Sequence, residues 1–316
     1  MRVFAPGKLV LTGAYAVLRG APAIVAATSR GAVADSSRPA ASPTPEVRAA
    51  LGGVPAPHVD ATEMFDGDRK LGLGASAAIL VASLGARASE EGVDLGLASS
   101  RDALFRRARA AHAEAQGGGS GVDVAASVYG GVLRYAVDDA SPLSVHLPDG
   151  ARLVVFTCDR SARTSDLLAR VGVFASRDPV THGACMDELV AIAVDAAATI
   201  DHGDLGGFVR AIQRASRALD RLGTACGTEI VPGSVRELAA AAEREGAALC
   251  VSGAGGGDVA VFVGPAAPSP TLLARARELG LTRLDLEIDD GGVRVLTSVA
   301  TTSLPASSAS REGITP

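Results

Sequence analysis

The stretch KLGLGASAAILVASLGARASEEG, residues 70–92, decides how this chain is expected to fold. Gly72 and Gly74 form a glycine turn, and apolar residues recur at helical spacing from Ala77 to Leu84. The free N–H groups of a helix's first turn and the positive end of its dipole favour an anion such as a triphosphate. The stretch matches neither Walker A nor GxGxxG, because the GK[ST] ending is absent and the glycine spacing differs. Taken alone, such a stretch is more often a plain turn followed by a helix.

The two lysines of the chain occupy positions that call for a physical reason. Of 30 basic residues, 28 are arginines and only Lys8 and Lys70 are lysines. The base composition of the gene could account for the excess of arginine. It does not explain why lysine remains at Lys8, in APGKLVL, and at Lys70, two residues before Gly72. A lysine is a compact charge on a flexible stem, whereas arginine is larger and forked. We therefore expect both lysines to face phosphate or carboxylate oxygens in a confined cleft.

Composition excludes several classes of protein. The 316 residues carry a net charge of −5 with 47% hydrophobic residues, which is typical of a soluble globular protein. The length suffices for one substantial core or for two modest domains that share an interface. This charge gives no electrostatic reason to bind nucleic acid or an anionic membrane. No apolar run of about 18 residues predicts a membrane span. The N-terminus lacks a signal-peptide pattern, so we expect a cytoplasmic protein whose four scattered cysteines are reduced.

Helical and strand patterns mix along the whole chain, which predicts an α+β fold. We expect two domains, residues 1–155 and 156–300, with a cleft between them and a disordered tail at 301–316. Residues 1–35 predict two or three strands, and residues 36–58 a long surface loop that holds at most a short helix. A helix is expected at 99–116, with Ser99 or Ser100 as N-cap and a solvated arginine face at 101–109. Further helices are expected at 164–176, 184–201, 204–222, 232–246 and 271–279. Residues 123–135 predict a short helix and then a strand. Further strands are expected at 151–158, near 282–288 and near 293–299. Two more are expected within 247–263, one on each side of a glycine turn.

Two more glycine loops complete a chemical pattern. SGAGGGD, residues 252–258, lies between two predicted strands, where glycine weakens a sheet unless a ligand approaches closely; a flexible turn is the alternative. Asp123 follows the glycine run 117–119, either as a helix N-cap or as a carboxylate that orients a substrate hydroxyl and takes its proton. Three glycine loops, one aspartate and two lysines together indicate phosphoryl transfer, which depends on positioning and charge neutralisation.

Three segments resemble the motifs of the GHMP kinase superfamily, in the same order and spacing. They are APGKLVLTGAYAVLRGAPAI (5–24), GLGASAA (72–78) and VSGAGGGDVAVFV (251–263), and the likeness covers residues 3–265. The resemblance implies an N-terminal domain like domain 2 of ribosomal protein S5 and a ferredoxin-like C-terminal domain. The segments AHAEAQGGGSGVDVAASVYGG (111–131), RKLGLGASAA (69–78) and SARTSDLLARV (161–171) are most similar to the phosphomevalonate kinase branch.

That resemblance implies ATP-dependent phosphorylation of 5-phosphomevalonate to 5-diphosphomevalonate in the mevalonate pathway of isoprenoid synthesis, with Mg²⁺. The partner would be a small molecule, and the protein a monomer or homodimer. Mevalonate kinase or another small-molecule kinase of the superfamily is the first alternative. The second is a ligand sensor that has the kinase fold without turnover.

The resemblance also implies roles for individual residues. Asp123 is the candidate base and Lys8 its cationic partner, which also touches substrate, while Ser76 ligates Mg²⁺. The candidate ATP-binding residues are Lys70, Gly72, Leu73, Gly74, Ala75, Ser76 and Ala77. The candidate substrate-binding residues are Lys8, Tyr15, Ser120, Gly121, Arg134, Ser165, Ser252, Gly253 and Ala254.

Three positions depart from the family pattern. Ala14 stands where many relatives have glutamate, and Ala75 replaces the first of two serines. His112 stands where mevalonate kinases carry a Mg²⁺-ligating glutamate, eleven residues before the aspartate. We expect His112 to be a packing or hydrogen-bonding residue rather than an acid or base, and Mg²⁺ to be held mostly by Ser76 and water.

Overall fold

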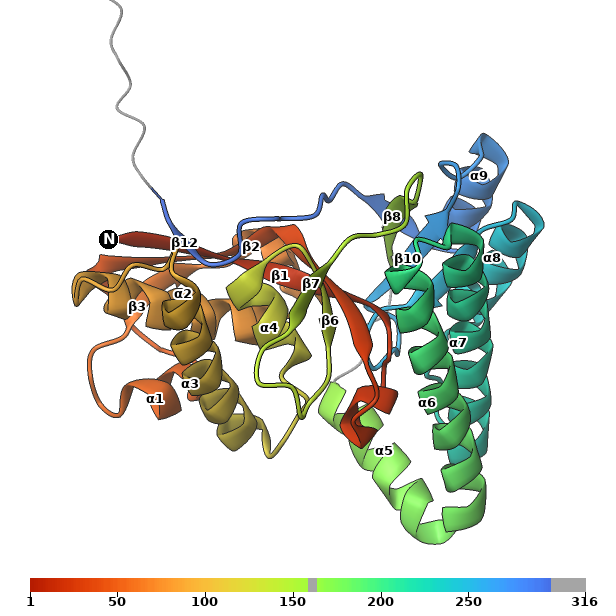
Figure 1. Ribbon diagram of the computed structural model, residues 1–316, viewed down its shortest axis with the longest axis horizontal. Helices are drawn as coiled ribbons and strands as arrows, with labels where there is room; N and C mark the ends of the chain where they lie inside the picture. Colours follow the sequence, from red (N-terminus) through yellow and green to blue (C-terminus); the bar gives the residue numbers. More distant parts are fainter. Residues whose placement is uncertain (159–163, 297–316) are drawn as a thin grey trace, which may run out of the picture.

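The structure, a computed structural model, describes residues 1–158 and 164–296. Two antiparallel sheets lie side by side, each with helices packed against it (Figure 1). The mixed α+β architecture expected from the sequence is confirmed. The predicted tail at 301–316 and the first part of the segment 161–171 lie outside the described residues. In the described part of the chain, no helix is both long and apolar enough to cross a membrane.

The first sheet is built on a long pair of strands, β1 (Arg2–Thr12) and β2 (Ala23–Pro39), with the short helix η1 (Ala16–Arg19) between them. Its order is β12-β1-β2-β6-β7, and β3 also pairs with β2. The pairing register of β1 and β2 shifts between Pro6 and Gly7, immediately before Lys8. The other strands are β3 (Pro57–Asp60), β6 (Val132–Tyr135), β7 (Leu143–Val145) and β12 (Arg294–Val295).

Four helices accompany this sheet: α1 (Pro45–Leu51), α2 (Ala75–Glu90), α3 (Ala98–Gln116) and α4 (Val122–Tyr129). Helix α2 packs on both β1 and β2 and is buried along most of its length, which fixes where its N-terminus lies. The turn before α2 follows η2 (Thr62–Met64) and a two-stranded ribbon of β4 (Phe65–Asp66) and β5 (Arg69–Lys70).

The second sheet has the order β11-β8-β10-β9, from β8 (Arg152–Thr157), β9 (Ala248–Val251), β10 (Val259–Gly264) and β11 (Thr282–Leu284). Its helices are α5 (Thr164–Arg177), α6 (Pro179–Asp201), α7 (Leu205–Cys226), α8 (Gly233–Arg244) and α9 (Pro270–Glu278). After β11 the chain returns to the first sheet and adds β12 beside β1 (Figure 1). The expected domain boundary at residue 155 falls inside β8, so the second sheet begins a few residues earlier.

Residues 36–58 are more ordered than the sequence prediction of a long loop. Strand β2 continues to Pro39, and α1 begins at Pro45 after Thr44, whose side chain accepts a hydrogen bond from the Val47 N–H. Proline at the first helical position and threonine before it are helix-start signals. The short helix that the sequence prediction allowed in this stretch is therefore present, and these signals mark where it begins.

Helix α3 also differs from prediction at two points. Its N-cap is Leu97, without a side-chain bond, so Ser99 and Ser100 lie inside the first turn. The arginine face is not wholly solvated, because the Arg101 guanidinium donates to the carbonyls of Leu95, Tyr129 and Gly291. Those acceptors come from three separate segments, which a local helical pattern does not reveal.

Candidate active site

The predicted glycine turn opens α2 as expected. Gly72 and Gly74 have φ values of 71° and 79°, and Gly74 is the N-cap of the helix. Strand β1 holds the turn in place at two points: the Lys8 backbone N–H donates to the Leu73 carbonyl at 2.8 Å, and Lys8 Nζ donates to the Gly72 carbonyl at 2.9 Å. The free N–H groups at the start of α2 therefore lie beside the charged end of Lys8.

Three loops that are far apart in the sequence meet around Lys8. A methyl group added at Gly74 would lie 2.9 Å from Lys8 Cγ and 3.6 Å from Asp123 Cβ. One added at Gly253 would lie 3.5 Å from Lys8 Nζ, and one at Gly72 would lie 2.9 Å from Asp258 Oδ2. The turn at 72–74, the start of α4 and the 252–258 loop are thus in direct contact, which is the arrangement expected from the sequence.

Asp123 stands at the start of α4, but not as its N-cap. Gly121 occupies the cap position, and Asp123 lies in the first helical turn with its side chain 21% exposed. One carboxylate oxygen, Oδ1, accepts the Val124 N–H at 2.9 Å, and Oδ2 lies 3.6 Å from His112 Nε2. The N-cap interpretation of this residue is wrong, because the left-handed conformation before the helix requires glycine.

Lys8 is a partly covered cation between two carboxylates. Burial lowers the pKa of Lys8 from its ordinary value, and the negative charges of Asp123 and Asp258 oppose that shift. A confined ammonium group at this place compensates nearby negative charge and remains able to attract more. Asp258 is the last residue of the third glycine loop, and its proximity to Lys8 was not predicted from the sequence.

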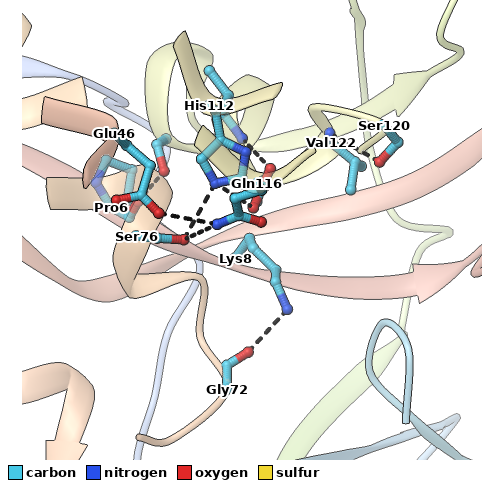
Figure 2. A network of polar contacts seen from close by, with 12 residues as sticks. Pro6, Lys8, Glu46, Gly72, Ser76, His112, Gln116, Ser120 and Val122 are labelled. Atoms are coloured by element: carbon cyan, nitrogen blue, oxygen red, sulfur yellow. Dashed lines mark hydrogen bonds and ion pairs between the residues drawn. The ribbon is translucent and has the colours of Figure 1, made fainter. Parts of the chain in front are cut away.

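A polar network connects the start of α2 with α3 and α1 (Figure 2). Ser76 Oγ lies 3.2 Å from His112 Nε2, and Gln116 Nε2 donates to Ser76 Oγ at 3.3 Å and to Glu46 Oε1 at 3.1 Å. His112 is 5% exposed, so the expectation of a hydrogen-bonding residue agrees with its position between Ser76 and Asp123. Glu46 and Gln116 were missed as site residues; the helix-start pattern Thr44–Pro45–Glu46 was the available signal for the first.

The predicted residues of the third loop are tied to the N-terminal segment. Ser252 Oγ accepts the Val10 N–H at 2.9 Å, and the Tyr15 hydroxyl donates to the Ala254 carbonyl at 2.8 Å. Tyr15 has a φ of 60°, the one positive φ of a non-glycine residue in the described part of the chain. Burial raises the pKa of Tyr15, which keeps its hydroxyl a neutral donor. A strained tyrosine thus fixes the loop that carries Ser252–Ala254.

Other predicted residues make contacts of a different kind. Ser120 Oγ accepts the Val122 N–H at 3.3 Å, which shapes the turn that includes Gly121. Arg134 forms an ion pair with Asp201 at 2.6 Å. Ser165 is exposed near the start of α5 and donates to Asp166, and Lys70 is exposed in β5.

The start of α2 presents its predicted nucleotide-binding residues mainly through the backbone. Ala75 and Ala77 are 8% and 0% exposed, and Leu73 is 1% exposed. Their side chains belong to the core, so any contact that they make with a nucleotide would come from main-chain groups. Ser76 is the exception, since its half-buried hydroxyl lies in the polar network.

The residues near Ser76 suit a divalent cation that brings ligands of its own. Within residues 1–158 and 164–296, no group of three or more His, Cys, Asp or Glu side chains could hold a metal ion. The oxygen donors of Ser76 and Asp123 are nevertheless the hard ligands that Mg²⁺ prefers, and Mg²⁺ commonly keeps several waters or phosphate oxygens. The donor set therefore fits a Mg²⁺ ion that arrives with a phosphate group.

The sequence of the chain is similar to sequences of known kinases. Residues 53–131 match the model of the GHMP kinases N-terminal domain. The chain is 30% identical over 223 residues to phosphomevalonate kinase from Streptomyces sp. (strain CL190), covering 63% of this chain and 59% of the relative. It is 26% identical over 277 residues to mevalonate kinase from Archaeoglobus fulgidus, covering 80% of this chain and 88% of that enzyme.

The fold is shared with solved structures of the same group. Phosphomevalonate kinase from Streptococcus pneumoniae, solved in complex with phosphomevalonate and AMPPNP, superposes with a TM-score of 0.74 at 20% identity. That likeness covers 91% of this chain and 99% of the other. Residues 53–131 thus resemble the GHMP kinases N-terminal domain in sequence, and the chain as a whole shares the fold of these kinases.

The resemblance to phosphomevalonate kinases expected from the sequence is confirmed by the Streptomyces relative, and the pneumococcal structure has the same fold. The sequence match extends over about three fifths of the length of the Streptomyces enzyme.

Proposed function

We propose that the protein is an ATP- and Mg²⁺-dependent kinase that phosphorylates 5-phosphomevalonate to 5-diphosphomevalonate. The observation that carries this proposal is the meeting of Lys8, the Gly72–Gly74 turn and Asp123. A phosphoryl-transfer enzyme needs a phosphate cradle, a cation for the developing charge and a carboxylate for the acceptor hydroxyl within reach of one another. These three elements come together here although Lys8 and Asp123 are 115 positions apart in the sequence.

The nucleotide's phosphates would lie against the N-terminus of α2. The first N–H groups of α2 and the left-handed glycine backbone before it would bind the phosphate oxygens. Mg²⁺, when bound, would neutralise charge on those phosphates, and the Ser76 hydroxyl would hold it. Lys70, exposed on β5 just before the turn, would contact the outer phosphate oxygens.

Asp123 and Lys8 would carry the transfer itself. Asp123 orients the acceptor hydroxyl and takes its proton as the acceptor oxygen bonds to the γ-phosphorus. The bond from that phosphorus to the oxygen bridging the β- and γ-phosphates breaks, and ADP leaves with the bridging oxygen. Lys8 stabilises the negative charge that spreads over the transferred group, because its ammonium is held in a confined, partly desolvated position.

The acceptor would bind between the 252–254 loop and the turn before α4. Ser252, Gly253 and Ala254 form one wall, fixed by Val10 and Tyr15, and Ser120 and Gly121 form the other. Arg134 is omitted from the proposed pocket because Asp201 engages its guanidinium. Ser165 is also omitted, since its hydroxyl bonds Asp166 on the exposed start of α5.

The experiment that tests the proposal is ADP release with 5-phosphomevalonate, mevalonate, homoserine and galactose, each with MgATP. We expect turnover on 5-phosphomevalonate well above the other three. Turnover on mevalonate instead would favour the second candidate, mevalonate kinase, which the match to the Archaeoglobus enzyme supports. ATP binding with no acceptor-dependent ADP release would identify a ligand sensor and overturn the proposal.

A further inference from the structure

Gln116, the last residue of α3, makes two hydrogen bonds from a single amide nitrogen. Nε2 donates one hydrogen to Glu46 Oε1 at 3.1 Å and the other to Ser76 Oγ at 3.3 Å (Figure 2). The amide thereby connects the first turn of α1 with the first turn of α2. It lies at the open side of the site, since Gln116 is exposed.

Glu46 is a buried carboxylate that determines which way this amide faces. Its side chain belongs to a residue only 7% exposed. Burial raises the pKa of Glu46, but the favourable interactions of its carboxylate with nearby donors, among them the Gln116 amide, and with His112 outweigh that effect, so the net pKa is lowered. An ionised carboxylate accepts hydrogen bonds and donates none. The amide nitrogen of Gln116, and not its oxygen, must therefore face Glu46 and Ser76.

The direction of the amide has consequences at Ser76. A serine hydroxyl has one hydrogen and two lone pairs. One lone pair accepts the Gln116 N–H, and His112 Nε2 lies 3.2 Å away on another side. If the amide turned over, its carbonyl oxygen would face both the hydroxyl and the site where the nucleotide phosphates are proposed to bind. An oxygen dipole there would repel the phosphates.

We propose that Glu46 and Gln116 are positioning residues that hold the Ser76 hydroxyl in the orientation required by the Mg²⁺–nucleotide complex. The inference rests on the proposed function, because it assumes that a nucleotide binds at the start of α2. Gln116 also precedes Gly117, where the loop toward Asp123 begins in a left-handed conformation with φ 72°. The same amide therefore anchors the end of α3 from which that loop departs.

The test is the affinity of the full-length protein for AMPPNP with Mg²⁺, measured by calorimetry, in Glu46→Gln, Gln116→Leu and the double variant. Removing a nearby negative charge would by simple electrostatics tighten binding of an anion. The proposal predicts the opposite for Glu46→Gln, an affinity about fivefold weaker, because the amide is free to turn. The double variant should bind no more weakly than Gln116→Leu, since Glu46 acts through Gln116.

Two control variants separate this effect from charge and from folding. Glu114→Gln removes an exposed carboxylate on the same helix and should leave affinity unchanged or slightly tighter. Gln213→Leu removes a glutamine amide that bonds the Ala247 carbonyl in the other half of the molecule, and should leave nucleotide affinity unchanged. In steady state, Glu46→Gln should raise the KM for MgATP and leave the KM for the acceptor unchanged.

The outcomes distinguish this inference from the function it rests on. If the wild-type protein binds no AMPPNP, the proposed function fails. If the wild type binds AMPPNP and Glu46→Gln binds it equally or more tightly, only the positioning role of Glu46 and Gln116 is overturned. Weaker binding in Glu46→Gln, with an unchanged melting temperature and no further loss in the double variant, supports it.

Discussion

The phosphate side and the acceptor side of the proposed site are built in different ways. On the phosphate side, Lys8, Gly72 and Gly74 lie in direct contact, and the Lys8 ammonium and backbone both bond the turn before α2. On the acceptor side, the contacts that hold the 252–254 loop are made by Tyr15 and Ser252, and Arg134 lies outside this side because it pairs with Asp201 on α6. Backbone geometry dominates the first side, and hydrogen bonds between a side chain and a backbone group distant in sequence dominate the second.

This difference predicts which substitutions should reduce activity most. A site built from left-handed glycines and one confined lysine tolerates little, since any added atom meets a neighbour. A site held by single hydrogen bonds tolerates more, because the loss of one such bond costs only about 1 kcal/mol. The expected effects therefore fall from the phosphate side to the acceptor side.

The largest effect is expected at Asp123, where the two sides meet. Asp123→Asn keeps the size of the side chain but removes the proton acceptor, so kcat should fall about a thousandfold. The affinity for AMPPNP should change little, since the phosphates are bound by α2. Assays of ADP release measure kcat, and calorimetry measures the affinity for AMPPNP. Full activity of the variant would refute the assignment of Asp123 as the base.

A second effect tests the backbone of the phosphate side. Gly74→Ala places a methyl group 2.9 Å from Lys8 Cγ at a φ of 79°, which displaces Lys8 and should lower kcat about a hundredfold. The matched control is Gly53→Ala, where φ is 94° and nothing lies within 4 Å. It should lose about 1 kcal/mol of stability from backbone strain alone and retain activity. Equal activity in the two variants would mean that the contact with Lys8 is unimportant.

A smaller effect is expected at Tyr15, which links the N-terminal segment to the acceptor side. Tyr15→Phe removes the hydrogen bond to the Ala254 carbonyl and should cost about 1 kcal/mol of unfolding free energy. The KM for the acceptor should rise about threefold while the KM for MgATP stays constant. A rise in the KM for MgATP alone would assign the loop to the nucleotide instead.

The smallest effect is expected at Arg134. Its ion pair with Asp201 is partly exposed, at 33% and 43% of the two side chains, so Arg134→Ala and Asp201→Ala should each change stability by less than about 1 kcal/mol. Both variants should leave the acceptor KM unchanged. A raised acceptor KM in Arg134→Ala but not in Asp201→Ala would return Arg134 to the acceptor pocket.

The same contrast explains what the sequence could and could not predict. Glycine turns that begin helices leave a local pattern, so the starts of α2 and α4 and the third loop were predicted within a few residues. The sequence allowed a short helix within the serine- and proline-rich stretch 36–58 but did not locate α1, so Glu46 was missed. The partners of Arg101 and Arg134 lie up to 190 residues away along the chain, and no local pattern indicates such pairs.

The central claim is that Asp123 and the start of α2 act on one nucleotide and one acceptor. A crystal structure of the full-length protein with Mg²⁺, AMPPNP and 5-phosphomevalonate tests it most directly. We expect the β- and γ-phosphates at the first turn of α2 and the Asp123 carboxylate about 3 Å from an acceptor oxygen. An AMPPNP molecule bound away from Gly72–Ser76, or an acceptor oxygen out of hydrogen-bonding reach of Asp123, would contradict the claim.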